Sequence, residues 1–159
     1  MAKLFFTKIH PQAVIPSQAY QNDAGLDLYA VEYPIILKPF IHTEVRTGLT
    51  VDIPYGYELQ VRSRSGLAFN SQVTLANGIG TIDQGYKGEI KVSLMYTPDY
   101  RYAPSLTLKT GAIAQLVLAP VTEPKVYELI ADANGMSVVN LIPNSTRVRD
   151  VKGFGSSTK

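Results

Sequence analysis

Turn-forming residues interrupt this chain so often that long helices have no room to form. Glycine occurs with proline, asparagine, glutamine, lysine or threonine in short turn signals at residues 54–56, 77–78, 84–85, 87–88 and 110–111. Between them, residues 57–62 and 89–94 alternate apolar with polar side chains, and residues 113–118 are mostly apolar. Short runs of these two kinds are typical of strands. The pattern therefore predicts an all-β fold, either a sandwich or a barrel.

The last third of the chain is less clear. Residues 124–131 could form a short helix, with Pro124 in its first turn and Asn134-Gly135 after its end. They could equally form a strand that buries Val126 and Leu129. A chain of 159 residues without internal repeats suits one domain. We interpret residues 1–143 as that domain and the polar residues 144–159 as a mobile C-terminal arm.

Composition and charge exclude several classes of protein. The chain has no cysteine, which excludes a disulfide framework and thiolate metal sites. The apolar run at residues 4–6 is too short for a signal peptide, and no later run is long enough for a membrane span. A net charge of +2 gives no reason to expect nucleic acid as a partner. We therefore expect a soluble cytoplasmic protein that binds no membrane, with a nuclear or organellar location left open.

The glycine-rich segment at residues 75–90 is the first candidate for chemistry. Its four glycines predict a β-hairpin whose backbone lets another molecule approach closely. In the simpler interpretation, Asp83 hydrogen-bonds to its own turn and Tyr86 packs in the core. In the functional interpretation, backbone amides bind the edge of a flat ring and Tyr86 presses against a sugar. Asp83 would then accept a proton from water.

Two polar segments could complete such a site. Arg62 and Arg64 lead into Ser65-Gly66, where a hydroxyl and turn amides beside a guanidinium could bind an anion. Surface arginines at a strand end are also common. Asp27, between two leucines, either faces solvent or is buried with a partner. An arginine or the water shell of a magnesium ion would suit that carboxylate.

Five short motifs occur in a fixed order along the chain: AGLDLYA, RSGLA, NGIGTIDQGYKGE, GAIAQLVL and GFGSST. Over residues 22–158 they resemble the motifs of the trimeric dUTP pyrophosphatase (dUTPase) family. The resemblance implies a distorted jelly-roll or β-barrel homotrimer whose active sites are shared between subunits. It also implies hydrolysis of dUTP to dUMP and pyrophosphate with Mg²⁺, by in-line attack of water on the α-phosphorus. That reaction limits uracil incorporation into DNA and supplies dUMP for thymidylate synthesis.

The resemblance also implies a role for individual residues. Asp83 would deprotonate the attacking water, and Tyr86 would stack on the deoxyribose. The slot for uracil would be shaped by Asn77, Gly80, Thr81, Ile82 and Lys91. Phosphate oxygens would be held by Arg64, Ser65, Gly66 and Gln115. Asp27 would contact the magnesium ion through water. The C-terminal arm would contribute Arg149 at the terminal phosphates, Phe154 over the uracil, and Gly155 and Ser156 beside it.

The sequence departs from the family pattern in three places. Gly111 and Ala112 stand where the family commonly has a charged pair, so any ion pair there is missing. Residues 150–152 replace glycines, so Arg147 or Lys152 could share the role of Arg149. Residues 119–148 form a longer stretch than usual. Two alternatives stay open: an enzyme similar to dCTP deaminase, and a catalytically silent trimer that binds nucleotide or a partner protein.

Overall fold

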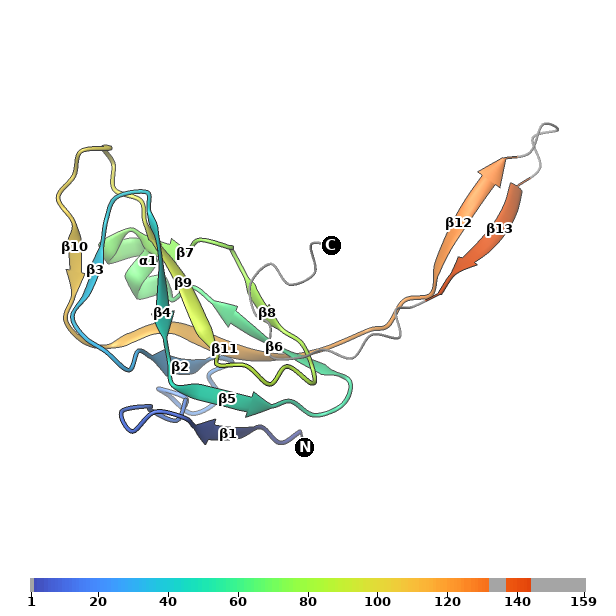
Figure 1. The fold of residues 1–159 in the computed structure, drawn as a ribbon, viewed down its shortest axis with the longest axis horizontal. Coiled ribbons are helices and arrows are strands. Elements are labelled where there is room, and N and C mark those ends of the chain that lie inside the picture. Colours follow the sequence, from blue (N-terminus) through green and yellow to red (C-terminus); the bar gives the residue numbers. More distant parts are fainter. Residues whose placement is uncertain (1, 132–136, 144–159) are drawn as a thin grey trace.

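The computed structural model describes residues 2–131 and 137–143, and strands make up most of the regular structure there (Figure 1). In chain order the elements are β1 (Phe5–Lys8), β2 (Leu26–Tyr29), β3 (Ile35–Leu37), β4 (His42–Arg46), β5 (Leu49–Asp52), β6 (Tyr57–Arg62), α1 (Ser65–Ser71), β7 (Val73–Leu75), β8 (Gly80–Ile82), β9 (Lys91–Tyr96), β10 (Leu106–Leu108), β11 (Ala112–Pro120), β12 (Val126–Ala131) and β13 (Ser137–Ile142). The predicted all-β class is confirmed.

The strands pair into small antiparallel sheets around one core. The largest sheet has the order β2-β11-β6-β8, and a second has the order β4-β9-β7. Strands β1 and β5, β3 and β10, and β12 and β13 form pairs. Side chains from many of these strands meet in one apolar cluster. Its most deeply buried large members include Leu28, Leu37, Leu49, Leu59, Leu94 and Leu116.

The alternating runs behave as the sequence predicts. In β6, Leu59 and Val61 are buried while Arg62 at the strand end is exposed. In β9, Val92 and Leu94 are buried, each with only 1% of its surface exposed. Successive side chains of a strand point to opposite faces, so every second residue reaches the core. The expected strand at residues 113–118 is confirmed within β11.

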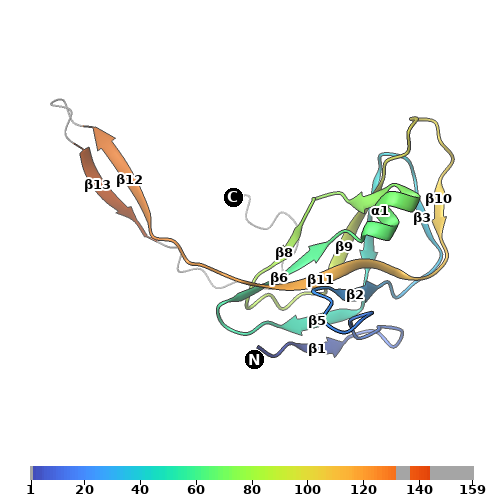
Figure 2. The ribbon, with the colours of Figure 1, turned by 180° about the vertical axis from the view of Figure 1, so that it is seen from behind.

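The ambiguous segment at residues 124–131 contains strand β12, which pairs with β13 in a hairpin. The helix alternative is wrong for residues 126–131, because β13 supplies a ladder of backbone hydrogen-bond partners. The expected burial is also wrong, since Val126 and Leu129 are 51% and 70% exposed. Both views show why: the hairpin projects away from the barrel at the end of β11 (Figures 1 and 2).

Residues 75–90 do not form the predicted β-hairpin. Strand β7 pairs with β9, whereas β8 pairs with β6 in the other large sheet. The segment therefore leaves one large sheet after β7, adds β8 to the other large sheet, and returns to the first sheet at β9. Turns are present at two of the three turn signals in this segment, and their glycines, Gly78 and Gly85, have φ values of 71° and 82°. Glycine adopts such positive φ values without the steric cost that other residues meet.

Helical structure is scarce in the described part of the chain. Helix α1 spans seven residues. No helix in the described ranges is long and apolar enough to cross a membrane.

Candidate functional site

The residues predicted to bind phosphate gather where β6 leads into α1. We call Asp27, Arg64, Ser65, Gly66 and Gln115 the Arg64 cluster. Arg64 is the last extended residue before the helix, with φ −91° and ψ 133°. Ser65 and Gly66 were predicted to form a turn, and they are instead the first, exposed residues of α1. The backbone amides at this end of the helix are not used by intrahelical bonds, so the expected anion site keeps its donors.

Asp27 is the partner of Arg64. The Nε atom of Arg64 lies 3.0 Å from Oδ1 of Asp27, and Nη2 lies 3.4 Å from Oδ2. The two side chains are 34% and 19% exposed, so the pair is partly shielded from solvent. Nη1 donates a third hydrogen bond, 2.9 Å long, to the carbonyl of Ala112. Of the partners expected for Asp27, the arginine is confirmed, and the guanidinium is held from two sides.

Gln115 completes this cluster from β11. It lies opposite Asp27 of β2 on one side and opposite Arg62 of β6 on the other. Its Nε2 atom donates a hydrogen bond of 2.9 Å to the carbonyl of Ser63. A Cβ atom on Gly25 would lie 2.1 Å from Oε1 of Gln115. Any side chain at residue 25 would therefore displace the Gln115 amide.

Sequence reasoning did not single out Gly25 or Ser63. Gly25 does not adopt a positive φ, so its backbone gives no reason for glycine. The reason is the close approach of a side chain that lies 90 residues later in the chain, which a single sequence does not reveal. The only available signal was the place of Gly25 inside the AGLDLYA motif.

The residues predicted to bind the base and sugar form a second group, the Asp83 cluster. It consists of Asn77, Gly80, Thr81, Ile82, Asp83 and Tyr86. Asp83 and Tyr86 are the ends of a tight turn in which the Tyr86 amide donates to the Asp83 carbonyl over 3.2 Å. The Tyr86 ring packs against the core, as the simpler interpretation expected, and its hydroxyl donates to the Glu89 carbonyl over 3.1 Å. The ring is thus held in a fixed place.

Gly80 brings the backbone of β8 close to its neighbours. A Cβ atom there would lie 3.2 Å from Cβ of Val61 and 3.4 Å from Nδ2 of Asn77. Lys91 belongs to β9, in the other large sheet, and its Nζ atom lies 2.7 Å from Oε1 of Glu44. The hydrogen bond that Lys91 donates to the Glu44 carboxylate raises the pKa of Lys91, so the ammonium group stays charged.

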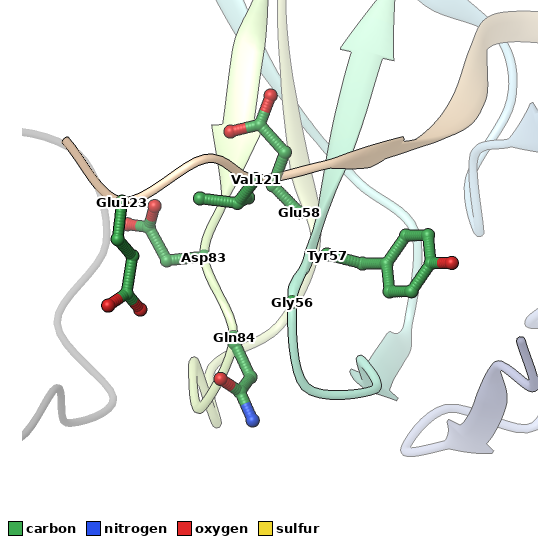
Figure 3. Close-up of a pocket in the computed structure, with 7 residues that line it drawn as sticks. All are labelled: Gly56, Tyr57, Glu58, Asp83, Gln84, Val121 and Glu123. Atoms are coloured by element: carbon green, nitrogen blue, oxygen red, sulfur yellow. The ribbon is translucent and has the colours of Figure 1, made fainter.

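A small pocket of about 180 Å³ opens beside Asp83 (Figure 3). It is lined by Gly56, Tyr57, Glu58, Asp83, Gln84, Val121 and Glu123. Asp83 and Glu123 lie close together in this view, while the ring of Tyr57 points away. The volume is too small for a nucleotide, whose sites usually exceed about 300 Å³. Three of the described lining residues are carboxylates and none is a cation, so the pocket alone would repel a polyphosphate.

Asp83 and Arg64 lie toward opposite ends of β6. Ile82 lies opposite Leu59, which places Asp83 one residue further toward Glu58, whereas Gly80 lies opposite Val61, between the two ends. Gln115 lies opposite Arg62, and Arg64 follows two residues later. Six residues of extended chain therefore separate Asp83 from Arg64, a distance of about 20 Å. The remaining predicted site residues, Arg149, Phe154, Gly155 and Ser156, lie outside the described residues.

Comparison with known proteins gives one consistent picture. A family model described as dUTPase matches residues 11–158. The deoxyuridine 5'-triphosphate nucleotidohydrolase of Picosynechococcus is 37% identical over 150 residues, which cover 94% of each chain. The protein of the same name from Hydrogenobaculum is 40% identical over 126 residues, 79% of this chain and 85% of its own.

Solved structures with the same fold come from staphylococcal phages. A variant of the phage 80alpha dUTPase with dUpNHpp matches with a TM-score of 0.70 and 23% identity, over 98% of each chain. A variant of the phage phi11 dUTPase, described with a structural Mg(II) ion, matches with a TM-score of 0.68 and 23% identity. That match covers 79% of this chain and 95% of the phage chain. The barrel expected from the resemblance is confirmed.

Proposed function

Because the chain belongs to the dUTPase family, we propose that its Arg64 and Asp83 clusters form one composite site for dUTP, supplied by different subunits of a homotrimer. The reaction is the hydrolysis of dUTP to dUMP and pyrophosphate, as the names of relatives over most of the chain indicate. The observation that carries the composite site is the separation of Asp83 from Arg64 along β6.

The separation matters because the chemistry needs both clusters at once. A water molecule that Asp83 activates must lie about 3–3.5 Å from the phosphorus it attacks. Groups that hold the phosphates must then lie beside Asp83, whereas Arg64 of the same chain is about 20 Å away along β6. Carboxylates line the pocket at Asp83, so this surface does not itself supply positive charge for a triphosphate.

The β12–β13 hairpin supports assembly with further copies of the chain. One face of this hairpin carries Tyr127, Leu129, Val139 and Leu141, which are 51–70% exposed. Residues directly opposite in an antiparallel pair share a face, and here Tyr127 faces Leu141 and Leu129 faces Val139. Four large apolar side chains on one face are unusual on a monomer and typical of an interface.

Within the composite site, each cluster has a distinct task. Asp83 accepts the proton of the water that attacks the α-phosphorus, which needs no nucleophilic side chain. Arg64, Gln115 and the first amides of α1 hold phosphate oxygens and stabilise the charge that develops on them. Tyr86 stacks on the deoxyribose and leaves no room for a 2′-hydroxyl. Arg149, Phe154, Gly155 and Ser156 close the site over the terminal phosphates and the base.

The described residues could contact a magnesium ion only through its bound water molecules. Asp27 is already paired with Arg64, and the described residues contain no group of three or more His, Cys, Asp or Glu side chains that could hold a metal. Mg²⁺ commonly keeps several water molecules and binds through substrate phosphates. Asp27 would therefore accept a hydrogen bond from a metal-bound water, and the ion would neutralise triphosphate charge.

The first test concerns substrate choice. The enzyme should hydrolyse dUTP far faster than UTP, dTTP or dCTP. Tyr86 excludes the ribose hydroxyl, the close-packed backbone at Gly80 excludes the thymine methyl group, and backbone groups that pair with the uracil edge do not match the donors and acceptors of cytosine. Pyrophosphate release measures all four rates in one assay. Comparable turnover of dTTP or UTP would contradict the roles given to residues 77–86, and deamination of dCTP would favour the deaminase alternative.

The second test concerns the hairpin. Replacing Leu129 and Leu141 with aspartate should convert trimers to monomers in sedimentation velocity, because an unpaired carboxylate buried in an interface costs several kcal/mol. The fold should persist, since both side chains are exposed in the single chain. The matched control is Tyr102→Asp, which replaces a side chain that is 92% exposed on the barrel. An unchanged sedimentation coefficient for the double variant would exclude the hairpin from the interface.

A further inference from the structure

The backbone at the start of β11 connects a half-buried tyrosine to the Arg64 cluster. Tyr33, in the loop between β2 and β3, donates its hydroxyl hydrogen to the carbonyl of Gly111. The same hydroxyl accepts a hydrogen bond of 3.3 Å from the Ala30 amide. The ring is half-buried and packs against the core. Burial raises the pKa of Tyr33, so its hydroxyl keeps the donated proton at neutral pH.

The next carbonyl along the chain holds Arg64. Ala112 accepts the 2.9 Å hydrogen bond from Nη1, so consecutive carbonyls contact Tyr33 on one side and Arg64 on the other. Pairing between β11 and β2 is irregular at this point, with a register shift between Ala112 and Ala114. A bulge interrupts the regular ladder, so the ladder alone does not fix the direction of the Ala112 carbonyl.

The side chains of residues 111 and 112 cannot anchor this part of the backbone. Gly111 has a φ of 100° and no side chain, and Ala112 carries only a methyl group. Within the described residues, the hydrogen bond from Tyr33 anchors the Gly111 carbonyl from outside β11, beside the pairing of Ala112 with Tyr29 of β2. Asp27 orients the opposite side of the guanidinium, so both sides of Arg64 are set by neighbours.

We propose that Tyr33 is a positioning residue for triphosphate binding, and that it acts through Gly111 and Ala112 on the orientation of Arg64. The inference rests on the proposed role of Arg64 in the function above. It adds a residue outside the five motifs, and it explains how a chain without side-chain anchors at residues 111–112 holds its phosphate-binding arginine.

The experiment is a double-mutant cycle on the full-length protein. Tyr33→Phe, Arg64→Ala and the double variant are titrated with dUpNHpp, a non-hydrolysable analogue of dUTP, by calorimetry. Tyr33→Phe should weaken binding about 3- to 10-fold, the range expected for one neutral hydrogen bond. Arg64→Ala should weaken it more. In the Arg64→Ala background, Tyr33→Phe should change nothing further, because the residue it positions is gone.

Two controls separate positioning from general stability. Tyr102→Phe removes a hydroxyl from an exposed ring, and Val45→Ala destabilises the buried core away from both clusters. Both should leave the affinity for dUpNHpp unchanged, and Val45→Ala should lower the melting temperature at least as much as Tyr33→Phe does. Equal weakening by Val45→Ala, or full additivity of Tyr33→Phe with Arg64→Ala, would overturn the proposal.

A second readout covers the case in which Tyr33→Phe folds poorly. In wild type, the Nε–Hε group of Arg64 should give a distinct NMR signal, because Asp27 and Ala112 hold the guanidinium. Tyr33→Phe should broaden or shift that signal, and an unchanged signal would overturn the proposal. If wild type neither hydrolyses dUTP nor binds dUpNHpp, the proposed function fails. If wild type is active but the effects of Tyr33→Phe and Arg64→Ala on dUpNHpp affinity are additive, only the positioning role of Tyr33 is refuted.

Discussion

Replacing Asp83 with asparagine is expected to lower kcat by at least about 10²-fold while the affinity for dUpNHpp stays close to that of wild type. Asparagine keeps the shape of the side chain at the turn but cannot accept a proton from water. General-base catalysis contributes about 10²–10⁴-fold to enzymatic rates, which corresponds to at least about 2.7 kcal/mol of transition-state stabilisation. Single-turnover hydrolysis of dUTP and calorimetric titration with dUpNHpp measure the two quantities separately.

The matched control for this variant is Asp52→Asn. It also removes one carboxylate, but Asp52 lies at the end of β5, is 66% exposed and, within the described ranges, forms an ion pair of 2.7 Å with the exposed Lys87. Exposed ion pairs contribute little, so stability and kcat should both stay near wild type. A single-turnover rate near wild type in Asp83→Asn would mean that Asp83 serves only its turn and that another group takes the proton.

Mixed trimers should recover activity that neither parent variant has. Asp83→Asn removes the base, and Arg64→Ala removes the guanidinium that holds the phosphates, so each homotrimer should be nearly inactive. If the two clusters of a site come from different subunits, a site can combine an intact Asp83 from one chain with an intact Arg64 from another. With equal and random mixing, about a quarter of the sites are complete, and activity should return to roughly that fraction of wild type.

The design needs proof that mixing occurred. Two different affinity tags and purification over both resins isolate heterotrimers, and native mass spectrometry confirms their composition. In these purified heterotrimers one site of the three is complete, so their activity should be about a third of wild type, against about a quarter for the unfractionated mixture. A trimer that mixes Asp83→Asn with the double variant Asp83→Asn, Arg64→Ala has no intact base and should stay at background. Background activity in confirmed mixtures of the two single variants would mean that both clusters act within one chain, against the composite site.

The fold class could be predicted because its signals are local. The turns at Gly78 and Gly85 follow from residue type, and alternation in β6 and β9 follows from the two faces of a strand. The partners of those strands could not be predicted in the same way. The glycine-rich segment looked like a hairpin because its turns are visible in sequence, whereas pairing of β8 with β6 depends on residues about twenty positions away.

The same distinction between local and long-range information applies to the candidate site. Residue types and motifs identified Asp83, Tyr86, Arg64 and Asp27 as groups of interest. Geometry between distant segments supplied the rest: the Arg64–Asp27 pair, the space that Gly25 leaves for Gln115, and the contact of Tyr33 with Gly111. These contacts join residues 37 to 90 positions apart, and nothing in the local pattern encodes them. The roles of individual site residues stay predictions for the experiments above.

The separation of Asp83 from Arg64 along β6 has a consequence for how the protein behaves at low abundance. A single chain would keep its barrel but hold only fragments of each site, so catalysis would depend on mass action among subunits. Specific activity should fall on dilution and return on concentration, and dUTP should resist the loss because it binds only the assembled form. A cell making few copies of this protein would hold it largely idle, and activity would rise more steeply than copy number.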